Sequence, residues 1–387
     1  MKVVKIIPNT FENESRDQRE ILALQSIGCD VIVIAKESDN PTDHGVETIR
    51  LSSRPLIKYI SNSTINRFAS LYLWSIKVRQ IKADIISCHD LICLFIGWLS
   101  TLFMIRKPLL IYDSHEFEYA RNVNRSVVLK LWIKYLERFL IKRCAFSIMV
   151  NQIIAEEVKK LHGLSELPIV VRNIPQYWKL NLDIIKEKKK DFKKKYGIKD
   201  SDALIVYQGN LMNGRGIEKS VEALQYVKNA YILFLGNCDK TYKGVIINLA
   251  QSNGVEKRII FHPAVSHSEL WKFTGMADVG LCNIDNVCQS YYYSLPNKLF
   301  EYIQALVPVV GSDFPEIARV IRNYGIGKCC NPEDPYSIAN AINEVIQLKS
   351  DATFDNNLKE AKRVLCWENE SAVLKEAYLK LIDKRIK

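Results

Sequence analysis

The chain has 387 residues, a length that suggests two domains of ordinary size. Apolar residues make up 48% of it and charged residues 25%, a composition that excludes disordered and fibrous proteins and is typical of a folded globular one. The formal net charge is +11, but no nucleic-acid-binding module is recognisable, so we do not expect nucleic acid as a partner.

The first half of the chain predicts an α/β domain. Short apolar segments typical of buried strands occur at residues 3–7, 31–35, 84–87, 109–112, 146–150 and 169–171. Helical patterns separate these segments, for example at residues 17–27, and such alternation favours a parallel sheet. The segment Asn173-Ile174-Pro175 ends this half, so we place a first domain at residues 1–175.

Part of this half is strongly basic. Residues 51–143 contain 15 lysines and arginines but six acidic residues. Within them, residues 127–143 have apolar residues at helical spacing with basic residues between. These basic residues are Lys130, Lys134, Arg138, Lys142 and Arg143. Such a helix either lies on an anionic membrane or covers the outside of a domain, and the sequence favours neither alternative.

The longest apolar run, residues 91–105, is shorter than the ~20 residues that span a bilayer, so we predict a buried helix there. The ten cysteines form no Cys-x-x-Cys pair, and the first strand is too short for a signal-peptide core. Free thiols in a reducing compartment are the simplest account. We therefore expect a cytoplasmic protein, with peripheral attachment to the inner face of the cell membrane as an open alternative.

Polar side chains follow three of the predicted strands. Asp113 and His115 come directly after one strand, and His89-Asp90 follow another. The carboxyl edge of a parallel sheet is where ligands bind, so we expect these side chains to face a ligand. Asp90 is also a reasonable N-cap for the next helix. Arg16, in the polar segment after the first strand, either meets an acceptor phosphate or faces solvent, and we favour solvent.

The second half repeats the strand–helix pattern. A lysine-rich run at residues 186–195 is read as a solvated linker helix. Strands are predicted at residues 203–207, 231–235, 258–261, 279–282 and 307–311. Helices are predicted at residues 217–228, 266–274, 315–323 and 335–348. We place a second domain at residues 176–366 and a final helix within residues 367–387.

A glycine-containing loop opens the second domain. Gly209, Gly214 and Gly216 lie between a strand and a helix, where glycine lets the backbone approach a phosphate. Arg215 can bind a diphosphate with its planar fork, or it is an ordinary surface residue. The loop is not Gly-x-Gly-x-x-Gly, so a nicotinamide cofactor is poorly supported.

The most informative stretch is residues 294–302. Ser294 is a good N-cap, and Pro296 is tolerated in a first helical turn. The free backbone N–H groups of a helix start near Asn297 suit a phosphate, and Lys298 adds a full charge. Glu301 shares a helix face with Lys298 and can accept hydrogen bonds from a diol. Phosphate beside ribose is what a nucleotide presents.

This stretch, with residues 307–312, resembles the donor-binding motif of family 4 glycosyltransferases. Residues 112–116 resemble their D-x-H-E element, residues 209–216 resemble their glycine turn, and the resemblance extends from about residue 1 to 385. It implies the GT-B fold, which has two Rossmann-like parallel-sheet domains facing a cleft and a C-terminal helix crossing back to the first domain. It also implies a retaining transfer from a nucleotide-diphosphate sugar.

The resemblance assigns roles residue by residue. His115 corresponds to the histidine that contacts the donor sugar near the reacting centre, so it is the catalytic candidate. His89 and Arg16 are the acceptor-side candidates. The candidates for donor binding are Gly209, Arg215, Ser294, Asn297, Lys298 and Glu301.

Two positions depart from the family pattern. Asn210 stands where a basic residue usually follows the first glycine of the turn, which leaves more of the charge to Lys298. Tyr293 stands where a first glutamate often contacts the donor sugar. Ribose binding by Glu301 is therefore better supported than recognition of the sugar.

We see no carboxylate cluster that suggests a metal, so we expect a metal-independent reaction without a cofactor beyond the donor. The expected acceptor is a glycan or a lipid-linked glycan in surface polysaccharide assembly. One rival is a nucleotide-sugar epimerase of the same fold, which needs no acceptor. Another is a non-catalytic scaffold subunit that binds a sugar nucleotide.

Overall fold

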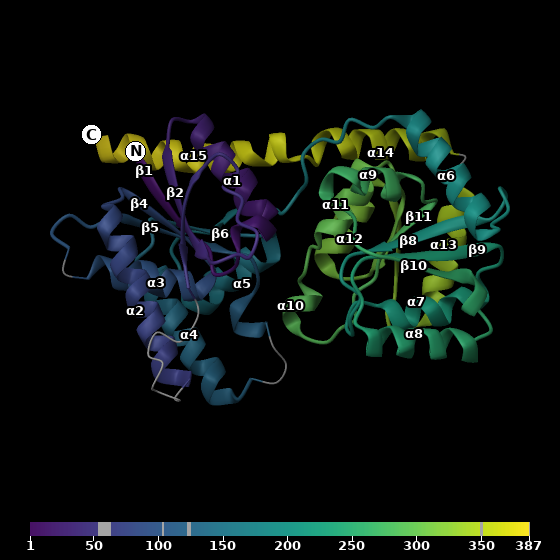
Figure 1. Cartoon of the computed structure of the whole chain (residues 1–387), viewed down its shortest axis with the longest axis horizontal. Coiled ribbons are helices and arrows are strands. Elements are labelled where there is room, and N and C mark those ends of the chain that lie inside the picture. The colour runs from purple at the N-terminus through teal and green to yellow at the C-terminus, as the bar shows by residue number, and fades with distance from the viewer. Residues whose placement is uncertain (53–62, 103, 122–124, 349–350, 387) are drawn as a thin grey trace. The chain divides into compact units, whose positions relative to one another are not determined.

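The computed structural model describes residues 1–52, 63–102, 104–121, 125–348 and 351–386 (Figure 1). Of the basic segment 51–143, residues 53–62, 103 and 122–124 lie outside this description. The chain divides into two compact units. The first comprises Met1–Arg172 and Glu370–Lys387, and the second comprises Asn173–Asn369.

The first unit is built on a seven-stranded sheet in the order β3-β2-β1-β4-β5-β6-β7, and every pair of neighbours is parallel. The strands are β1 (Lys2–Ile6), β2 (Asp30–Lys36), β3 (Glu47–Leu51), β4 (Ile85–His89), β5 (Leu109–Ser114), β6 (Phe146–Met149) and β7 (Ile169–Val170). The strands buried on both faces are mainly apolar, as is usual in parallel sheets.

Helices cover both faces of this sheet (Figure 1). The helices are α1 (Ser15–Ser26), α2 (Ser63–Ile81), α3 (Asp90–Thr101), α4 (Val127–Ile141), α5 (Gln152–His162) and the last helix, α15 (Trp367–Ile386). Two short 3₁₀ turns are η1 (Phe11–Asn13) and η2 (Glu118–Ala120). Local sequence sets the ends of α5, because Asn151 accepts a hydrogen bond from the N–H of Ile154 and Gly163 adopts a left-handed conformation after the last turn.

The second unit has a six-stranded parallel sheet in the order β10-β9-β8-β11-β12-β13. The strands are β8 (Ala203–Gln208), β9 (Ala230–Leu235), β10 (Ile259–His262), β11 (Val279–Cys282), β12 (Val309–Ser312) and β13 (Gly327–Cys330). The helices are α6 (Leu182–Tyr196), α7 (Ile217–Ala223), α8 (Lys240–Ser252), α9 (His267–Gly275), α10 (Gln289–Tyr292), α11 (Asn297–Gln304), α12 (Pro315–Tyr324), α13 (Pro335–Leu348) and α14 (Ala352–Val364), with η3 (Leu224–Tyr226) and η4 (Glu256–Arg258).

Both sheets reverse their strand order at the same place. In each unit the first strand lies between the second and the fourth, so the chain leaves β1 and β4, or β8 and β11, in opposite directions across the sheet. In open parallel sheets this reversal opens a crevice at the carboxyl ends of the two strands, and ligands bind there. The fold therefore points to the residues after β1 and β4 in the first unit and after β8 and β11 in the second.

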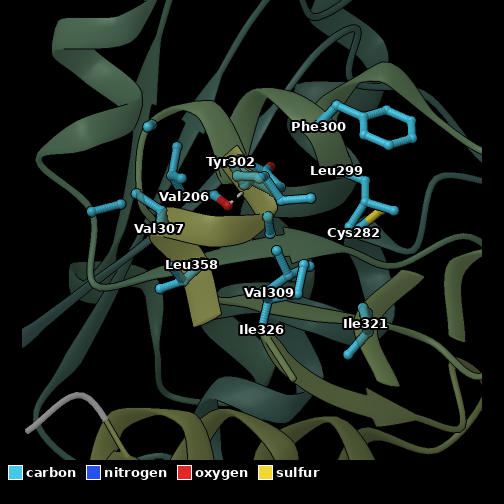
Figure 2. Close-up of a cluster of buried hydrophobic side chains, with 14 of the residues drawn as sticks. Val206, Cys282, Leu299, Phe300, Tyr302, Val307, Val309, Ile321, Ile326 and Leu358 are labelled. Atoms are coloured by element: carbon cyan, nitrogen blue, oxygen red, sulfur yellow. Dashed lines mark hydrogen bonds between the residues drawn. The ribbon is translucent and has the colours of Figure 1, made fainter. Parts of the chain in front are cut away.

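A buried tyrosine connects α11 to the second sheet (Figure 2). The hydroxyl of Tyr302 lies 3.0 Å from the carbonyl oxygen of Leu281 and 3.3 Å from that of Val206, and it accepts a hydrogen bond from the N–H of Gln208. Its ring covers Gly280, where a Cβ atom would approach Tyr302 to 2.5 Å. This contact fixes the register of α11 against β8 and β11, and so fixes where Lys298 points.

All predicted strands are confirmed, with ends within two residues of the expected ones. β3 and β13 were not predicted, because β3 is only partly buried and β13 contains glycine and lysine. The linker prediction for the lysine-rich run is wrong. It forms part of α6, which packs in the second unit through buried Ile185 and Phe192, while Lys189 pairs with Asp278 at 2.6 Å.

The predicted crossing of the C-terminal helix to the first unit is confirmed. Tyr378 of α15 is 1% exposed and its ring meets that of Phe146 edge-on at 5.5 Å. Arg172 forms a bidentate pair with Glu370, with Nη2 2.7 Å from Oε2. Residues 370–386 thus belong to the core of the unit that begins the chain. Among the described residues, we find no helix with the length and apolar character needed to cross a membrane.

Candidate active site

The first unit buries a cluster of charged side chains near the carboxyl ends of β1 and β5. Lys5 of β1 is 1% exposed, and its Nζ lies 2.9 Å from Asp17 and 3.1 Å from Asp113 and also contacts Glu20. Arg16 shares these carboxylates, with Nε 2.8 Å from Glu20 and Nη2 3.0 Å from Asp113. The cluster therefore connects α1 to both strands through ion pairs.

These cations determine the protonation of Asp113. Burial alone would raise the pKa of its carboxyl group, but Arg16 and Lys5 outweigh burial and hold that pKa well below its usual range. The preference for solvent at Arg16 is wrong, because this side chain is only 2% exposed. Its guanidinium instead fixes a carboxylate beside the candidate catalytic histidine.

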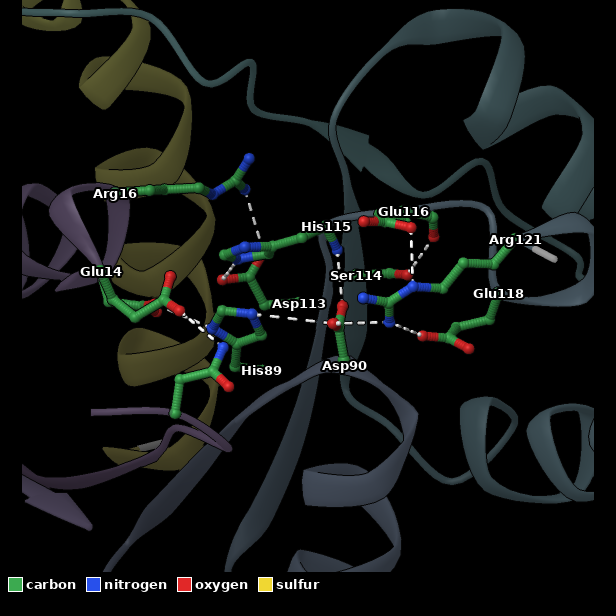
Figure 3. A network of polar contacts seen from close by, with 12 residues as sticks. Glu14, Arg16, His89, Asp90, Asp113, Ser114, His115, Glu116, Glu118 and Arg121 are labelled. Atoms are coloured by element: carbon green, nitrogen blue, oxygen red, sulfur yellow. Dashed lines mark hydrogen bonds and ion pairs between the residues drawn. The ribbon is translucent and has the colours of Figure 1, made fainter. Parts of the chain in front are cut away.

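Two histidine rings are stacked with a tilt of 33° at the ends of β4 and β5. The centroids of His89 and His115 are 3.6 Å apart, and the side chain of His115 is 16% exposed, whereas that of His89 is 4% exposed (Figure 3). Burial lowers the pKa of His89, but Asp17, 2.8 Å from its Nδ1, reverses the effect and raises the pKa to about 9. His89 therefore carries a positive charge at neutral pH directly beneath His115.

Asp90 holds the backbone of His115. Its Oδ1 accepts a hydrogen bond from the N–H of His115 at 2.9 Å, and Nε2 of that ring lies 3.4 Å from Asp113 (Figure 3). The N-cap prediction for Asp90 is wrong, because His89 occupies the cap and Asp90 is the first residue of α3. Asp90 has a φ of 62°, and strain of this kind at a non-glycine residue is typical of functional sites.

A second set of ion pairs extends from Asp90 along the loop after β5. Arg121 lies 2.9 Å from Glu118, 3.5 Å from Asp90 and 2.7 Å from Glu116 (Figure 3). Burial, aided by Asp90, raises the pKa of Glu118 to about 7 despite the opposing charge of Arg121. Glu118 therefore changes protonation near neutral pH.

In the second unit, Lys298 places a buried amine at the carboxyl edge of β8. It is 9% exposed, and its Nζ lies 3.5 Å from the centroid of the Tyr207 ring. Among the described residues, no atom accepts a hydrogen bond from this Nζ. Burial lowers the pKa of Lys298 from its ordinary value of 10.5 to about 7. A buried amine without an acceptor is ready to receive an anionic ligand.

Glu301, one turn further along α11, is oriented by a chain of side chains. Gln208, the last residue of β8, donates from Nε2 to Glu301 Oε2. Thr274 donates to Gln208 Oε1 at 2.7 Å, which fixes the orientation of the Gln208 amide. Both Lys298 and Glu301 thus lie beside the end of β8, as their shared helix face predicts.

The glycine turn has the close backbone packing that the sequence suggests. Gly209 has a φ of 121°, and a Cβ atom there would lie 4.0 Å from the Lys298 amine. At Gly216, with a φ of 69°, a Cβ atom would lie 2.6 Å from that of Asn283. Arg215 lies over the ring of Tyr291, 5.1 Å from its centroid. The backbone beside Lys298 favours glycine because Gly209 has a positive φ, a conformation that residues with a side chain rarely adopt.

The start of α11 differs from the prediction. The helix begins at exposed Asn297, and Pro296 occupies the N-cap. Ser294 is therefore not the cap, and its hydroxyl donates to the carbonyl oxygen of Tyr291 at 2.7 Å. Tyr293, at the departure from the family pattern, accepts a hydrogen bond from Gln289 at 3.2 Å. Ser294 and Tyr293 thus shape the loop before the helix.

Asn210, the other departure, is exposed at the glycine turn, and its carbonyl oxygen accepts a hydrogen bond from the Tyr207 hydroxyl at 3.2 Å. Tyr207 in turn carries Lys298 on its ring. Tyr207 therefore contacts both the glycine turn and the buried lysine. Asn210 contributes its backbone carbonyl to this arrangement and no positive charge.

Two groups of side chains in the first unit have ligand atoms close enough together for a metal ion. One is Glu14, Asp17, His89 and His115, and the other is Asp17, Glu20 and Asp113. The second group already surrounds the ammonium of Lys5, and Asp17 of the first group is bound to His89. A metal ion in the second group would have to displace the ammonium of Lys5, and one in the first group would have to replace the proton that Asp17 favours on His89. The chain also contains an Asp-x-Asp sequence, Asp200-Ser201-Asp202, a pattern that can bind a metal ion. It lies just before β8, at the opposite end of that strand from Lys298.

Sequence reasoning missed several of these residues. Lys5 interrupts the apolar run of β1, and a lysine in such a strand is a detectable signal of a buried ion pair. Gln208 and Tyr207 lie inside a strand pattern and carry no comparable signal. Glu118 is separated from Asp90 by a whole strand, so their proximity depends on the order of the sheet.

Comparison with known proteins agrees with this geometry. Residues 20–173 match the family model described as Glycosyltransferase Family 4, and residues 188–364 match that described as Glycosyl transferases group 1. The chain belongs to the family 4 glycosyltransferases. An uncharacterized glycosyltransferase of Methanocaldococcus jannaschii is 25% identical over 297 residues, which are 74% of this chain and 73% of that protein.

Solved structures confirm the GT-B fold of this glycosyltransferase. Sucrose-phosphate synthase from Thermosynechococcus elongatus superposes with a TM-score of 0.76 at 19% identity, covering 99% of this chain and 100% of that one. Anabaena HepE in complex with UDP and glucose superposes with a TM-score of 0.74 at 13% identity, covering 98% and 100%. At these identities the likeness concerns the fold.

Replacing Lys298 by methionine is expected to stabilise the unliganded glycosyltransferase. The apolar stem is kept, but the amine that burial disfavours is gone. Between pH 7 and 10.5 the unfolded chain holds a proton on Lys298 that the folded protein has lost, so the wild type gains stability as the pH rises. At about 1.4 kcal/mol per pKa unit, the advantage of Lys298→Met should be on the order of 5 kcal/mol at pH 6 and fall to roughly 2 kcal/mol at pH 9.

Thermal unfolding of both proteins at the two pH values measures this advantage. Lys240→Met, which removes an exposed lysine, serves as the control and should change little. An advantage of Lys298→Met that is the same at both pH values would mean that Lys298 is not held in its neutral form by burial.

Proposed function

We propose that this glycosyltransferase moves a sugar from a nucleotide-diphosphate donor to a hydroxyl of a glycan or lipid-linked acceptor in surface polysaccharide assembly. The observation that carries the donor assignment is the pair of Lys298 and Glu301 beside the glycine turn. A cationic amine meets the diphosphate, and a carboxylate accepts from the ribose diol. The UDP complex of the fold neighbour HepE supports a nucleotide donor.

The donor-binding residues contribute positive charge and hydrogen-bond donors to a diphosphate. The Lys298 amine lies over the ring of Tyr207, and no described atom accepts a hydrogen bond from it. A bound phosphate would provide that acceptor and a compensating negative charge. Arg215 and the N–H groups at the start of α11 add further donors toward a diphosphate. Charge that develops on the leaving diphosphate would be stabilised by these fixed donors, an effect worth ~3–4 kcal/mol per donor removed.

On the acceptor side, we assign His115 to the chemical step and His89 to its support. Protonated His89 beneath the ring and Asp113 beside it limit how His115 can turn. We propose attack on the same face as the departing diphosphate, hence retention, and no metal ion in the step. Ion-paired Asp113, whose charge Arg16 and Lys5 compensate, is poorly placed to be a covalent nucleophile.

We also propose that the first unit rests on an anionic membrane surface, where a lipid-linked acceptor would be found. α4 packs through Ile133, Leu140 and Ile141, yet a second set of its large apolar side chains is exposed, including Val128 at 77% and Tyr135 at 63%. Exposed apolar residues interleaved with lysine and arginine are typical of helices that lie in a membrane interface.

The donor site is tested by a thermal-shift screen with UDP, GDP, ADP and CMP. We expect one nucleoside diphosphate to stabilise the wild type and to lose about tenfold in affinity in Glu301→Ala, because the ribose contact is gone. Glu256→Ala, on an exposed carboxylate of the same unit, is the control. If no nucleotide stabilises the wild type, the donor-site assignment fails.

The chemical step is tested with the nucleotide sugar that the screen selects. We expect His115→Ala to lower kcat by roughly 10² or more, whereas His267→Ala, on an exposed histidine, changes it little. Proton NMR of the product should show the anomeric configuration of the donor. An inverted product would refute retention, conversion of the donor without acceptor would favour the epimerase, and binding without turnover would favour the scaffold.

Membrane association is tested by flotation with vesicles. Binding should require anionic lipid and should weaken in Lys142→Glu, since each basic residue near an anionic surface contributes about 1 kcal/mol. Lys186→Glu makes the same charge change on α6 of the second unit and should have little effect. Flotation that does not depend on anionic lipid would contradict the proposal.

A further inference from the structure

The first unit contains a cavity beside the Asp90–His115 contact. Its volume is about 630 Å³, which falls in the range of small-molecule sites, roughly 300–1,000 Å³. The walls come from the loop after β1, from α2, the start of α3, the loop after β5 and one face of α4. Asp90 belongs both to this wall and to the contact that positions His115, so the cavity adjoins the candidate catalytic residue.

One end of the cavity is polar and balanced in charge. Asp90, Glu118, Arg121 and Arg125 line it. Arg121 pairs with both carboxylates, and Arg125 donates to the backbone carbonyl of Glu118 at 2.7 Å. Above about pH 7, where Glu118 is ionised, the two carboxylates balance the two arginines and donors lie beside acceptors. This end then suits hydroxyl groups, which both donate and accept, better than it suits a phosphate.

Most of the other lining residues are apolar. They include Leu71, Phe95, Trp132 and Leu136, together with Ile92, whose side chain is 45% exposed. The side chain of Trp132 is 60% exposed, so this wall continues onto the outward apolar face of α4. A molecule bound in the cavity therefore meets both a group of hydrogen-bonding side chains and an apolar surface that leads outward at Trp132.

We propose that the cavity binds the acceptor as a glycolipid-type amphiphile. Its sugar hydroxyls lie against Asp90, Glu118 and Arg121, and its alkyl or isoprenoid chain lies against Phe95, Trp132 and Leu136. Trp132 joins the cavity to the exposed face of α4, and the charge-balanced end favours an uncharged sugar head. This assignment rests on the proposed function, because the bound head is the acceptor of that reaction.

The probe is decyl β-D-glucopyranoside below its micelle concentration, titrated by calorimetry into the full-length protein. We expect it to bind at least about tenfold more tightly than glucose and more tightly than decyl phosphate. Trp132→Ala and Ile92→Ser, both at exposed positions, should weaken binding about fivefold or more. Tyr135→Ala, on the exposed face of α4 outside the cavity, should change it less than twofold.

Three results overturn the proposal: absent binding of decyl glucoside, tighter binding of decyl phosphate, or equal losses in Trp132→Ala and Tyr135→Ala, which would indicate adsorption to α4. The nucleotide screen on the same samples separates the two assignments. Nucleotide binding without decyl glucoside binding refutes the cavity assignment alone. Decyl glucoside binding without nucleotide binding refutes the donor site and leaves the amphiphile site standing.

Discussion

A lysine in the middle of a buried parallel sheet needs carboxylates, and this requirement organises the first unit. Lys5 of β1 draws on α1 for two of them and on β5 for the third. Loss of one partner would leave an uncompensated buried charge, at a cost of about 3–5 kcal/mol. Through Asp113 and Asp17 the same ion pairs reach His115 and His89, so the position of the two histidine rings depends on a charge deep in the sheet.

The second unit contains the opposite case. Lys298 is nearly as buried as Lys5, but the described part of the chain offers its amine the face of Tyr207 and no hydrogen-bond acceptor. Lys5 therefore has carboxylate partners within the protein. Lys298 has none, and an anionic ligand can supply one. The pKa of Lys5 is raised because its carboxylates outweigh the effect of burial. The pKa of Lys298 is lowered because burial outweighs the effect of the charges near it.

The first unit also combines two kinds of surface. Asp90 is strained and tied to His115, and from it ion pairs lead through Arg121 to Glu118. Beyond them the cavity wall becomes apolar and meets the exposed face of α4 at Trp132. A charged site, a cavity and an outward apolar helix face are thus continuous on one unit, which is the arrangement an amphiphilic acceptor requires.

The sequence by itself determined the two α/β units, most strand positions and the placement of Lys298 and Glu301 on one helix face, because apolar periodicity and helical spacing are local properties of the chain. It misplaced the cap of α11, the solvent exposure of Arg16 and the role of α6. The last two depend on partners far along the chain: Asp113 for Arg16, and Asp278 for Lys189 of α6. Tertiary structure alone decided which lysine found carboxylates, because strand order places β5 beside β4 and sets its carboxylate near β1.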